Sequence, residues 1–375
     1  MSHEIIKHCR LYRYSLPFQT PLMFGQKMLS ERKGLLLQIE WNTGATGIGE
    51  IAPLPGWSRE SLKDVLRLMP ALMRDLQGHN VTDLLFGKRE DSILFGLPPS
   101  IVFGVETALL STPAARRNNP LFISGETVDL TINGLLNFNR QFDLDADASI
   151  AKRFEIIKVK APFTDPDLAL SYLRGIRDAN PGLQLLLDAN QGWDLKALTP
   201  YLPELRELDI FYVEEPFASI TESEAFFKAA GIHYALDEQW ISNSAEILKK
   251  IEQKQLPGLR AIVVKPTLFG SIIKLENIAS RLAFHGIQLV ISSCFESGVG
   301  ISTLSRLAYN LSPGSFAGLD TIKSFKSDLL NPPLHLANNA ITVYPLVSQP
   351  FSLVEAFYTP INPKILEQYI ESNRP

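Results

Sequence analysis

Short apolar runs that end in polar residues alternate with longer amphipathic stretches through the middle of the chain. The runs are rich in leucine and β-branched residues, which is the pattern of strands buried on both faces in a parallel sheet. The stretches between them, such as 166–177 and 243–251, predict helices. The predicted strands are Val128–Ile132, Glu155–Lys160, Gln184–Asp188, Ile210–Glu214, Tyr234–Asp237, Ala261–Lys265, Leu289–Ser293 and Phe316–Asp320.

The spacing of these runs predicts how the strands are connected. Their polar ends recur at intervals of about 25 residues, the length of a strand, a loop, a helix and the return in a right-handed βαβ unit. Eight such strands in succession predict a closed barrel. An open, doubly wound sheet is the alternative, but it would need a glycine-rich fingerprint after its first strand, and none follows residues 128–136.

The two ends of the chain differ from this middle part. Residues 1–118 contain an alternating segment at 35–41 and helical patterns at 60–86 and 99–111, which predict a separate α+β domain. Residues 119–321 form the predicted barrel. The tail, 322–375, contains an extended segment at 340–344 and a final short helix, and we expect it to fold back on the first domain.

Composition and charge exclude several classes of protein. With 36 basic and 40 acidic residues and a net charge of −4, the chain has no electrostatic footprint for nucleic acid or for an anionic membrane. No apolar run is long enough to span a bilayer. Two cysteines, Cys9 and Cys294, cannot form a disulfide framework. The start of the chain lacks a secretory signal, so we expect a cytoplasmic protein. The sequence does not define an oligomeric state.

Charged residues gather at the ends of the predicted strands. Lys158 and Lys160 are two positions apart, so both side chains point to the same face of one strand. Three carboxylates, Asp188, Glu214 and Asp237, end the next three strands, and Lys265 ends the one after. In a barrel the carboxyl ends of the strands meet at one mouth, where active sites lie.

Each of these charges alone has an ordinary explanation. An Asp after a strand is commonly a helix N-cap or a turn residue, and two lysines on one strand commonly mark an exposed edge. Three carboxylates on adjacent strands, however, would repel each other unless a cation lay among them. An all-oxygen ligand set suits Mg²⁺, with Mn²⁺ as an alternative. The spacing alone leaves Glu214 and its neighbour Glu215 as competing ligands.

Two further motifs are candidates for a role at this mouth. The segment Gly47–Ser58 is rich in Gly, Pro and a Trp, and by itself it is best explained as a rigid surface turn. Gly298–Thr303 follows the seventh predicted strand and opens a helix. Its free N–H groups would suit a substrate carboxylate.

Taken together, these motifs resemble the enolase superfamily, and within it the muconate-lactonizing subgroup and the o-succinylbenzoate synthase family. The resemblance covers nearly the whole chain. It is carried by the lysine motif, by the carboxylates on three successive strands, by Lys265, and by the following segments: 47–61 (GIGEIAPLPGWSRES), 99–109 (PSIVFGVETAL), 188–190 (DAN), 213–216 (VEEP), 264–268 (VKPTL), 291–297 (ISSCFES) and 318–321 (GLDT).

The resemblance implies an α/β fold: a (β/α)7β TIM-like barrel with an N-terminal α+β capping domain that the C-terminal tail completes. It implies Mg²⁺ bound by Asp188, Glu214 and Asp237. Lys160 and Lys265 would be acid/base residues on opposite sides of a small carboxylate substrate, and Lys158 a supporting charge. The loop around residues 16–32, together with 53–57, would close over the substrate. The contacts to the substrate would include Ser292, Gly318 and Asn190.

The implied activity is a magnesium-dependent dehydration in menaquinone biosynthesis, through an enediolate. Proteins with the same lysines also racemise N-succinylamino acids or epimerise dipeptides, and these activities are the alternative. Dipeptide epimerases usually carry Asp-x-Asp on the last strand, and 319–321 (LDT) does not supply it.

Overall fold

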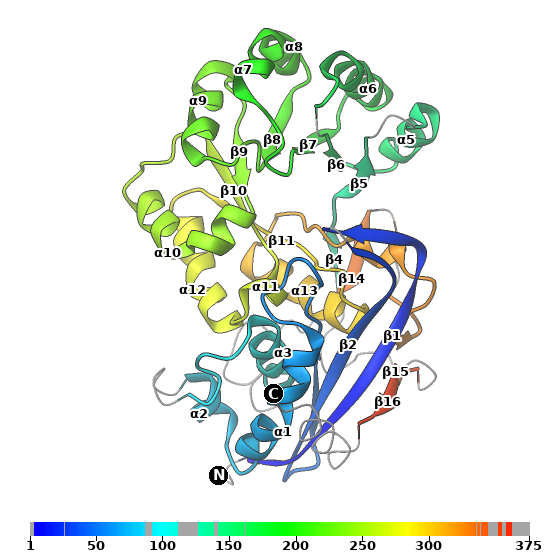
Figure 1. Cartoon of the computed structure of the whole chain (residues 1–375), viewed down its shortest axis with the longest axis vertical. Helices are drawn as coiled ribbons and strands as arrows, with labels where there is room; N and C mark the ends of the chain where they lie inside the picture. Colours follow the sequence, from blue (N-terminus) through cyan, green and yellow to red (C-terminus); the bar gives the residue numbers. More distant parts are fainter. Residues whose placement is uncertain are drawn as a thin grey trace.

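The computed structural model describes residues 4–25, 27–86, 92–111, 127–138, 142–161, 163–334, 336–337, 339–343, 352–354 and 358–361. These residues form an elongated molecule with an antiparallel sheet and helices at one end and a curled parallel sheet with outer helices at the other (Figure 1). The predicted fold class is confirmed. The predicted boundary at residues 118 and 119 and the predicted final helix lie outside the described residues.

The first part, which we call the cap, is built on a long hairpin. Its four-stranded sheet has the order β16-β1-β2-β3, and alternate residues of β2 face the helices, as period-two patterning requires. The tail contributes β16 to one edge of this sheet, where it pairs with β1. The elements are β1 (Ile6–Phe24), β2 (Lys27–Trp41), β3 (Thr46–Ile51), α1 (Leu62–Leu76), α2 (Val81–Phe86), α3 (Pro99–Leu110) and β16 (Tyr358–Pro360).

The barrel consists of seven parallel strands in sequence order. They are β5 (Gly134–Asn137), β6 (Ile156–Lys160), β7 (Gln184–Asp188), β8 (Ile210–Glu214), β9 (Tyr234–Leu236), β10 (Leu259–Val264) and β11 (Gln288–Ile291). The helical segments are α5 (Leu144–Ala151), α6 (Pro166–Ala179), α7 (Leu195–Leu198), η3 (Thr199–Tyr201), α8 (Leu202–Glu207), α9 (Ile220–Ala230), α10 (Glu238–Glu252), α11 (Pro266–Phe269), α12 (Ile272–Phe284), α13 (Gly298–Leu311) and η4 (Asp320–Ser324). Helix α10 begins before its predicted start and has a kink at Asn243.

The first predicted barrel strand, Val128–Ile132, is wrong in detail. Val128–Thr131 forms β4, which pairs with β14 (Ala340–Val343) in an antiparallel sheet that also contains β13 (Leu336–Ala337). The first barrel strand is β5, a few residues later. An apolar run of this kind fits either a barrel strand or a strand that pairs with the tail. The local pattern therefore could not show that β4 pairs with β14 and not with the barrel. Two further short tail strands, β12 (Leu330–Asn331) and β15 (Ser352–Leu353), pair with each other.

The last predicted strand, 316–320, closes the ring through isolated bridges. Ala317 bridges Ile132 and Gly318 bridges Ser292, both in parallel orientation. The N–H of Asn133 donates to the carbonyl of Ala317 (3.1 Å), and the N–H of Gly318 donates to the carbonyl of Ile291 (2.8 Å). This short segment therefore joins β11 to the start of β5.

The inner face of the barrel explains why the charged residues share one mouth. Side chains alternate along each strand, and the inward positions hold an apolar layer that includes Ile156, Leu186, Tyr212, Ala235, Val263 and Val290. Two positions further along each strand, the next inward side chain is a lysine, a carboxylate or Ser292. The apolar layer is thus the floor beneath a polar ring.

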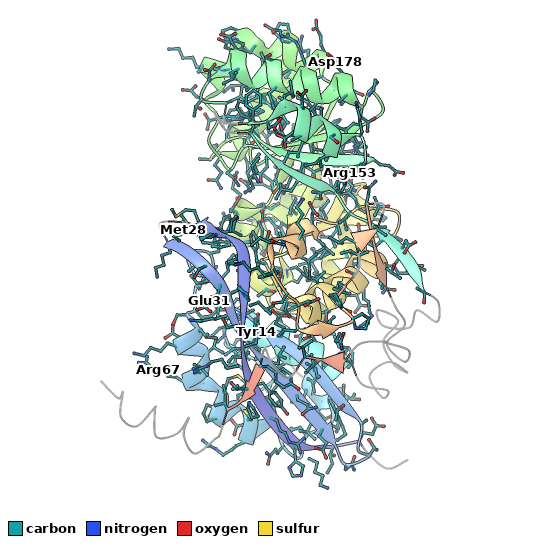
Figure 2. All side chains as sticks on the ribbon, turned by 90° about the vertical axis from the view of Figure 1, so that its right-hand side faces the viewer. Tyr14, Met28, Glu31, Arg67, Arg153 and Asp178 are labelled. Carbon is teal, nitrogen blue, oxygen red and sulfur yellow. The ribbon has the colours of Figure 1, made fainter. Side chains whose placement is uncertain are left out.

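Cap and barrel share one apolar core. The cluster that contains Leu35 and Trp41 of β2 and Met69 of α1 also contains Ile262 of β10 and Leu275 of α12. Figure 2 shows Met28 near the end of the cap hairpin that reaches up beside the barrel, and Asp178 on an outer helix at the far end. Within the described residues, no helix has the length and apolar character needed to cross a membrane.

Candidate active site

A cavity of about 430 Å³ lies at the carboxyl ends of the barrel strands. Leu22, Met23 and Phe24 from the tip of the cap hairpin cover part of it, and so do Leu54 and Trp57. The segments predicted to close over the substrate therefore do line this mouth, although 16–32 is a strand hairpin rather than a loop. All nine predicted site residues line the same cavity.

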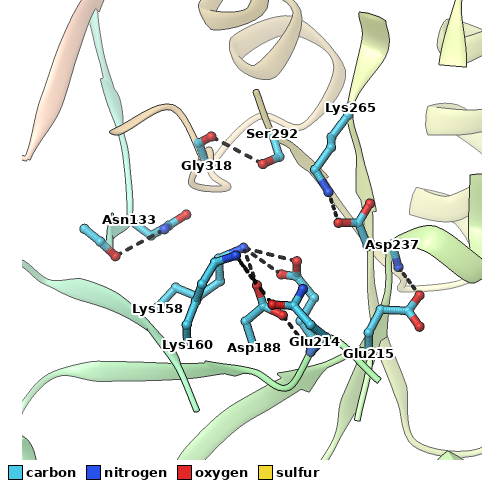
Figure 3. Close-up of polar contacts among 12 residues, drawn as sticks. Asn133, Lys158, Lys160, Asp188, Glu214, Glu215, Asp237, Lys265, Ser292 and Gly318 are labelled. Carbon is cyan, nitrogen blue, oxygen red and sulfur yellow. Dashed lines mark hydrogen bonds and ion pairs between the residues drawn. The ribbon is translucent and has the colours of Figure 1, made fainter. Parts of the chain in front are cut away.

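The lysine pair of β6 points at two of the predicted metal ligands (Figure 3). The Nζ atom of Lys158 lies 3.1 Å from Oε1 of Glu214 and 3.7 Å from Oδ2 of Asp188. Lys160 is less engaged: its Nζ is 3.9 Å from Asp188 and 3.5 Å from Oδ1 of Asn190. The side chain of Lys158 is 13% exposed and that of Lys160 is 42% exposed. Lys160 is therefore the more accessible lysine of this pair to a ligand in the cavity.

Lys265 lies on the far side of the carboxylates from the lysine pair (Figure 3). Its ammonium group is in a close ion pair with Oδ2 of Asp237. It also lies over the ring of Trp57, with Nζ 5.1 Å from the ring centroid, so the cap supplies an aromatic face to a barrel cation. Cationic groups thus stand on two sides of the cavity with carboxylates between them.

Burial dominates the electrostatics of this group. Burial raises the pKa of Glu214 to about 7, although the nearby Lys158 lowers it. Burial alone would lower the pKa of Lys158, but the carboxylates of Glu214 and Asp188 outweigh it and raise the pKa. Burial also lowers the pKa of Lys265, but the negative charge of Asp237 raises it by more. The pKa of Lys265 therefore lies well above the ordinary value. Both buried lysines are therefore held in the charged form.

Glu214 and Glu215 have different surroundings. Glu214 faces the cavity. Glu215 points away from it: its Oε1 accepts the N–H groups of Asp237 (2.7 Å) and Gln239 (3.0 Å), and its Oε2 accepts the Gln239 side-chain amide (2.7 Å). The oxygens of Glu215 are occupied by hydrogen bonds, which favours Glu214 as the residue available to a ligand.

Asp237 stands at the N-cap position of α10, yet its side chain makes no capping hydrogen bond. The ordinary explanation of an Asp after a strand therefore does not hold for this residue. Its Oδ1 atom is buried without a hydrogen-bond partner among the residues that the structure describes. An unpartnered buried carboxylate oxygen calls for a ligand such as a cation.

Several loops that leave the strand ends are strained. Asn190, Glu215 and Phe295 have positive φ angles of 44°, 44° and 59°, a region that residues other than glycine seldom occupy. Such strain persists only where the surrounding structure enforces it, and it clusters at functional sites. Asn is one of the residue types that adopt this region most readily, whereas the sequence carries no signal for the conformations of Glu215 and Phe295.

Ser292 and Gly318, the predicted substrate contacts, lie next to each other, and the Ser292 hydroxyl donates to the carbonyl of Gly318 (3.3 Å). A side chain at position 318 would meet Ser292 Oγ at 2.8 Å, so glycine keeps this part of the cavity open. Other cavity residues were not predicted from the sequence: Asn133, Asn137, Asp320 and Lys323. Asp320 pairs with Lys323 three residues further on and also accepts the N–H of Leu135 (3.2 Å), a contact that exists only because the 316–320 segment closes the ring beside β5.

The prediction for the start of α13 is wrong. The N–H groups of Ser297 and Gly300 donate to Glu50 (3.0 and 2.8 Å), and that of Gly298 donates to Asp328 (2.8 Å). Protein carboxylates therefore take the position expected for a substrate carboxylate. Glu50 lies in β3 and is 1% exposed, so the first half of the segment 47–58 is a buried strand and not a surface turn.

The three carboxylates fit a hard divalent ion in charge and ligand type. Asp188, Glu214 and Asp237 are 4%, 2% and 2% exposed and end neighbouring strands. Among the described residues, no three acidic, His or Cys side chains are arranged as a group around one point. Lys158 and Lys265 lie against the carboxylates instead. The donor set and the unpartnered Asp237 oxygen nevertheless fit Mg²⁺ or Mn²⁺.

Comparison with known protein families agrees with this architecture. Residues 6–112 match the model described as "MenC, N-terminal domain" and residues 142–345 match "Enolase C-terminal domain-like". The chain is 32% identical over 332 residues to the o-succinylbenzoate synthase of Vibrio cholerae serotype O1 (strain ATCC 39315 / El Tor Inaba N16961), covering 87% of this chain and 93% of that protein. It is 31% identical over 336 residues to that of Proteus mirabilis (strain HI4320), covering 87% and 93%.

Solved structures show the same fold. The dipeptide epimerase from Cytophaga hutchinsonii, solved with Mg and a dipeptide, has a TM-score of 0.78 at 21% identity and covers 96% of this chain and 100% of that chain. The L-Ala-D/L-Glu epimerase from Bacillus subtilis has a TM-score of 0.77 at 20% identity and covers 91% and 96%. With its strand-end carboxylates and lysines, the chain belongs to the enolase superfamily. Within that superfamily it belongs to the o-succinylbenzoate synthase family.

Proposed function

We propose that this chain converts 2-succinyl-6-hydroxy-2,4-cyclohexadiene-1-carboxylate to 2-succinylbenzoate with release of water, as a step of menaquinone biosynthesis. Family membership over most of the chain supports this reaction. The observation that carries the proposal is the placement of Lys160 and Lys265 on two sides of one cavity, with three carboxylates between them.

Lys160 is the proposed base. It is the most exposed of the three cavity lysines that end the strands, at 42% against 13% for Lys158 and 15% for Lys265. Its ammonium group is also the one without a close ion pair. Lys158 and Lys265 are held charged by their carboxylate partners, so they suit the stabilisation of negative charge.

The proposed reaction begins when Lys160 takes the proton from the carbon that carries the ring carboxylate. The electron pair left behind forms an enediolate, whose charge the ammonium groups of Lys158 and Lys265 stabilise. The C–O bond at the neighbouring ring carbon then breaks. The departing hydroxide receives a proton from a lysine ammonium group, water leaves, and the ring becomes aromatic.

Asp188, Glu214 and Asp237 are the proposed ligands of a bound Mg²⁺. When bound there, the ion would supply positive charge to the substrate carboxylate, which lowers the barrier to removal of the neighbouring proton. Asn190, Ser292 and Gly318 are proposed substrate contacts, since they line the cavity beside the lysines. Phe24 and Trp57 of the cap would exclude water from above.

The test is a spectrophotometric assay of dehydration with and without EDTA, followed by restoration with Mg²⁺. Lys160→Ala should abolish turnover, because it removes the base, and should leave calorimetric Mg²⁺ binding close to that of the wild type. Lys228→Ala is the control, since Lys228 is exposed on α9, away from the cavity. Turnover by Lys160→Ala would exclude it as the base. A wild type that leaves this substrate unchanged but exchanges the α-proton of N-succinylamino acids in D2O would instead be a racemase.

A further inference from the structure

Arg32 is a buried cation at the junction of the cap and the barrel. It lies on β2, and the residue is 1% exposed. A guanidinium group has five N–H donors in a fixed planar arrangement. A buried charge of this kind is stable only when its donors are satisfied.

All five donors of Arg32 reach backbone carbonyl oxygens. Nε donates to Phe295 (3.1 Å) and Nη2 to Cys294 (3.4 Å), both in the loop between β11 and α13. Nη2 also donates to Ala52 (2.5 Å), and Nη1 donates to Pro53 (2.8 Å), both just after β3. The remaining Nη1 bond goes to Lys33 (3.1 Å). One side chain therefore ties a cap loop to a barrel loop.

The cap loop held by Arg32 carries a wall of the active site. Leu54 follows Pro53 directly. The N–H of Leu54 donates to Ser58 Oγ (2.8 Å), and the carbonyl of Leu54 accepts the N–H of Trp57 (3.1 Å). This compact turn places the Trp57 ring over Nζ of Lys265. A shift of the Pro53 carbonyl would therefore be passed to Trp57 and to the surroundings of Lys265.

The barrel loop held by Arg32 carries another wall of the cavity. Cys294 and Phe295 line the cavity, and Phe295 has the strained φ angle of 59°. The Phe295 ring packs edge-to-face on Phe24 at the hairpin tip, with centroids 4.9 Å apart. Because the Arg32 Nε–H donates to the Phe295 carbonyl (3.1 Å), Arg32 stabilises this conformation.

We propose that Arg32 is a positioning residue for the dehydration: its guanidinium group sets the relative placement of Trp57 and Phe295, two of the aromatic residues that line the active site. This inference rests on the proposed function for its kinetic effect. Its structural effect, the placement of Trp57, does not depend on which substrate the site takes.

The first experiment measures Trp57 directly. The chain has four tryptophans; Trp41, Trp193 and Trp240 are 0%, 7% and 0% exposed, whereas Trp57 is 37% exposed. Acrylamide quenching of fluorescence therefore reports mainly on Trp57, and Trp57→Phe identifies its share. We expect Arg32→Lys to increase quenching, because one ammonium group cannot hold both loops.

Glu106→Gln is the matched control. Glu106 of α3 is buried and also ties the cap to the barrel, since its Oε2 accepts the N–H groups of Ile272 (2.6 Å) and Ile273 (3.3 Å) on α12. It does not line the cavity. The Glu106→Gln variant should therefore show the same quenching of Trp57 as the wild type, even if its melting temperature is lower.

The second experiment is steady-state kinetics on folded protein. Displacement of positioning groups by about 1 Å can lower rates by about 100-fold, so we expect Arg32→Lys to lower kcat/KM by about 10- to 100-fold. KM should rise because the displaced walls bind the substrate less well, and kcat should fall because the surroundings of Lys265 change. Glu106→Gln should change neither constant.

Each outcome decides the proposal. Wild-type quenching, kcat and KM in Arg32→Lys would overturn it. If neither Arg32→Lys nor Arg32→Gln folds while Glu106→Gln does, Arg32 serves stability alone and the proposal fails. If the wild type does not dehydrate the substrate, the proposed function fails, and the quenching comparison still decides the role of Arg32.

Discussion

Glu214 and Glu215 are neighbours in the chain, yet their carboxylates do different work. Glu214 faces the cavity and Lys158, whereas Glu215 accepts three N–H donors from residues after β9. Glu215 therefore holds the backbone of Asp237, one of the proposed metal ligands, from behind. The two residues could not be separated by pattern, because both are acidic and both end the same run. Next to Glu214, which points into the barrel mouth, Glu215 has a positive φ of 44° and points the other way.

Glu215→Gln should destabilise the protein and weaken Mg²⁺ binding. The amide keeps one acceptor oxygen and places an N–H group against a donor, and hydrogen bonds to a charged group contribute about 1.5–3 kcal/mol each. We expect a loss of about 2 kcal/mol in the free energy of unfolding, measured by urea denaturation, and a higher Kd for Mg²⁺ by calorimetry. Glu222→Gln, on the exposed face of α9, is the control for the charge change. Wild-type values in both measurements would refute this role for Glu215.

At the scale of elements, β3 and α3 are unusually close. A Cβ atom on Gly49 would overlap the carbonyl oxygen of Gly104, and one on Gly104 would overlap the side chain of Ile51. Glycine at both positions lets the strand lie against the helix, and this contact helps to place Glu50, which then binds the start of α13. The arrangement of these elements thus depends on positions that carry no side chain.

Gly49→Ala should lower the melting temperature strongly. Overpacking of a tight contact typically costs 1–3 kcal/mol and occasionally more, and we expect about 3 kcal/mol because the overlap is with backbone. Gly182→Ala is the matched control, since the nearest atom to its added Cβ would be Asn180 Oδ1 at 3.8 Å. Thermal unfolding followed by circular dichroism measures both. Equal melting temperatures for the two variants would show that β3 and α3 can separate at little cost.

At the scale of the whole molecule, the cap is a fixed part of the enzyme. One apolar core extends from β2 and α1 into β10 and α12. Arg32 and Glu106 make hydrogen bonds across the junction at two separate places. Strand β16 of the tail completes the cap sheet against β1. The walls that the cap contributes to the active site are therefore set by the same packing that stabilises the whole fold.

The junction should also make stability depend on pH through Glu106. Burial raises the pKa of this carboxyl above the ordinary 4.5, although hydrogen bonds from Ser271, Ile273 and Ile272 lower it. Because the folded state binds the proton more tightly, the stability that Glu106 contributes is fully present below about pH 4.5 and is lost as the pH rises through the folded-state pKa.

The measurement is the melting temperature of the wild type minus that of Glu106→Gln, which cannot titrate at this position. We expect this difference to decrease between pH 4.5 and pH 8. Parallel melting profiles for the two proteins, or a difference that grows with pH, would contradict the raised pKa.

The sequence by itself determined the barrel and the polar ring. Lys158, Lys160, Asp188, Glu214, Asp237 and Lys265 were all predicted at the mouth, and all line the cavity. This succeeded because strand periodicity is local: residues two apart share a face, and parallel strands end at the same edge. Their catalytic and metal-binding roles stay predictions.

Only the tertiary structure decided which polar groups are free for a ligand. The N–H groups of α13 looked available, but Glu50, about 250 residues earlier, occupies them. Arg32, between Glu31 and Lys33 in the sequence, gave no signal, because its acceptors at Cys294 and Phe295 lie more than 260 residues away. Hydrogen bonds between distant segments leave no periodic trace in the sequence, so their partners are defined only when the chain has folded.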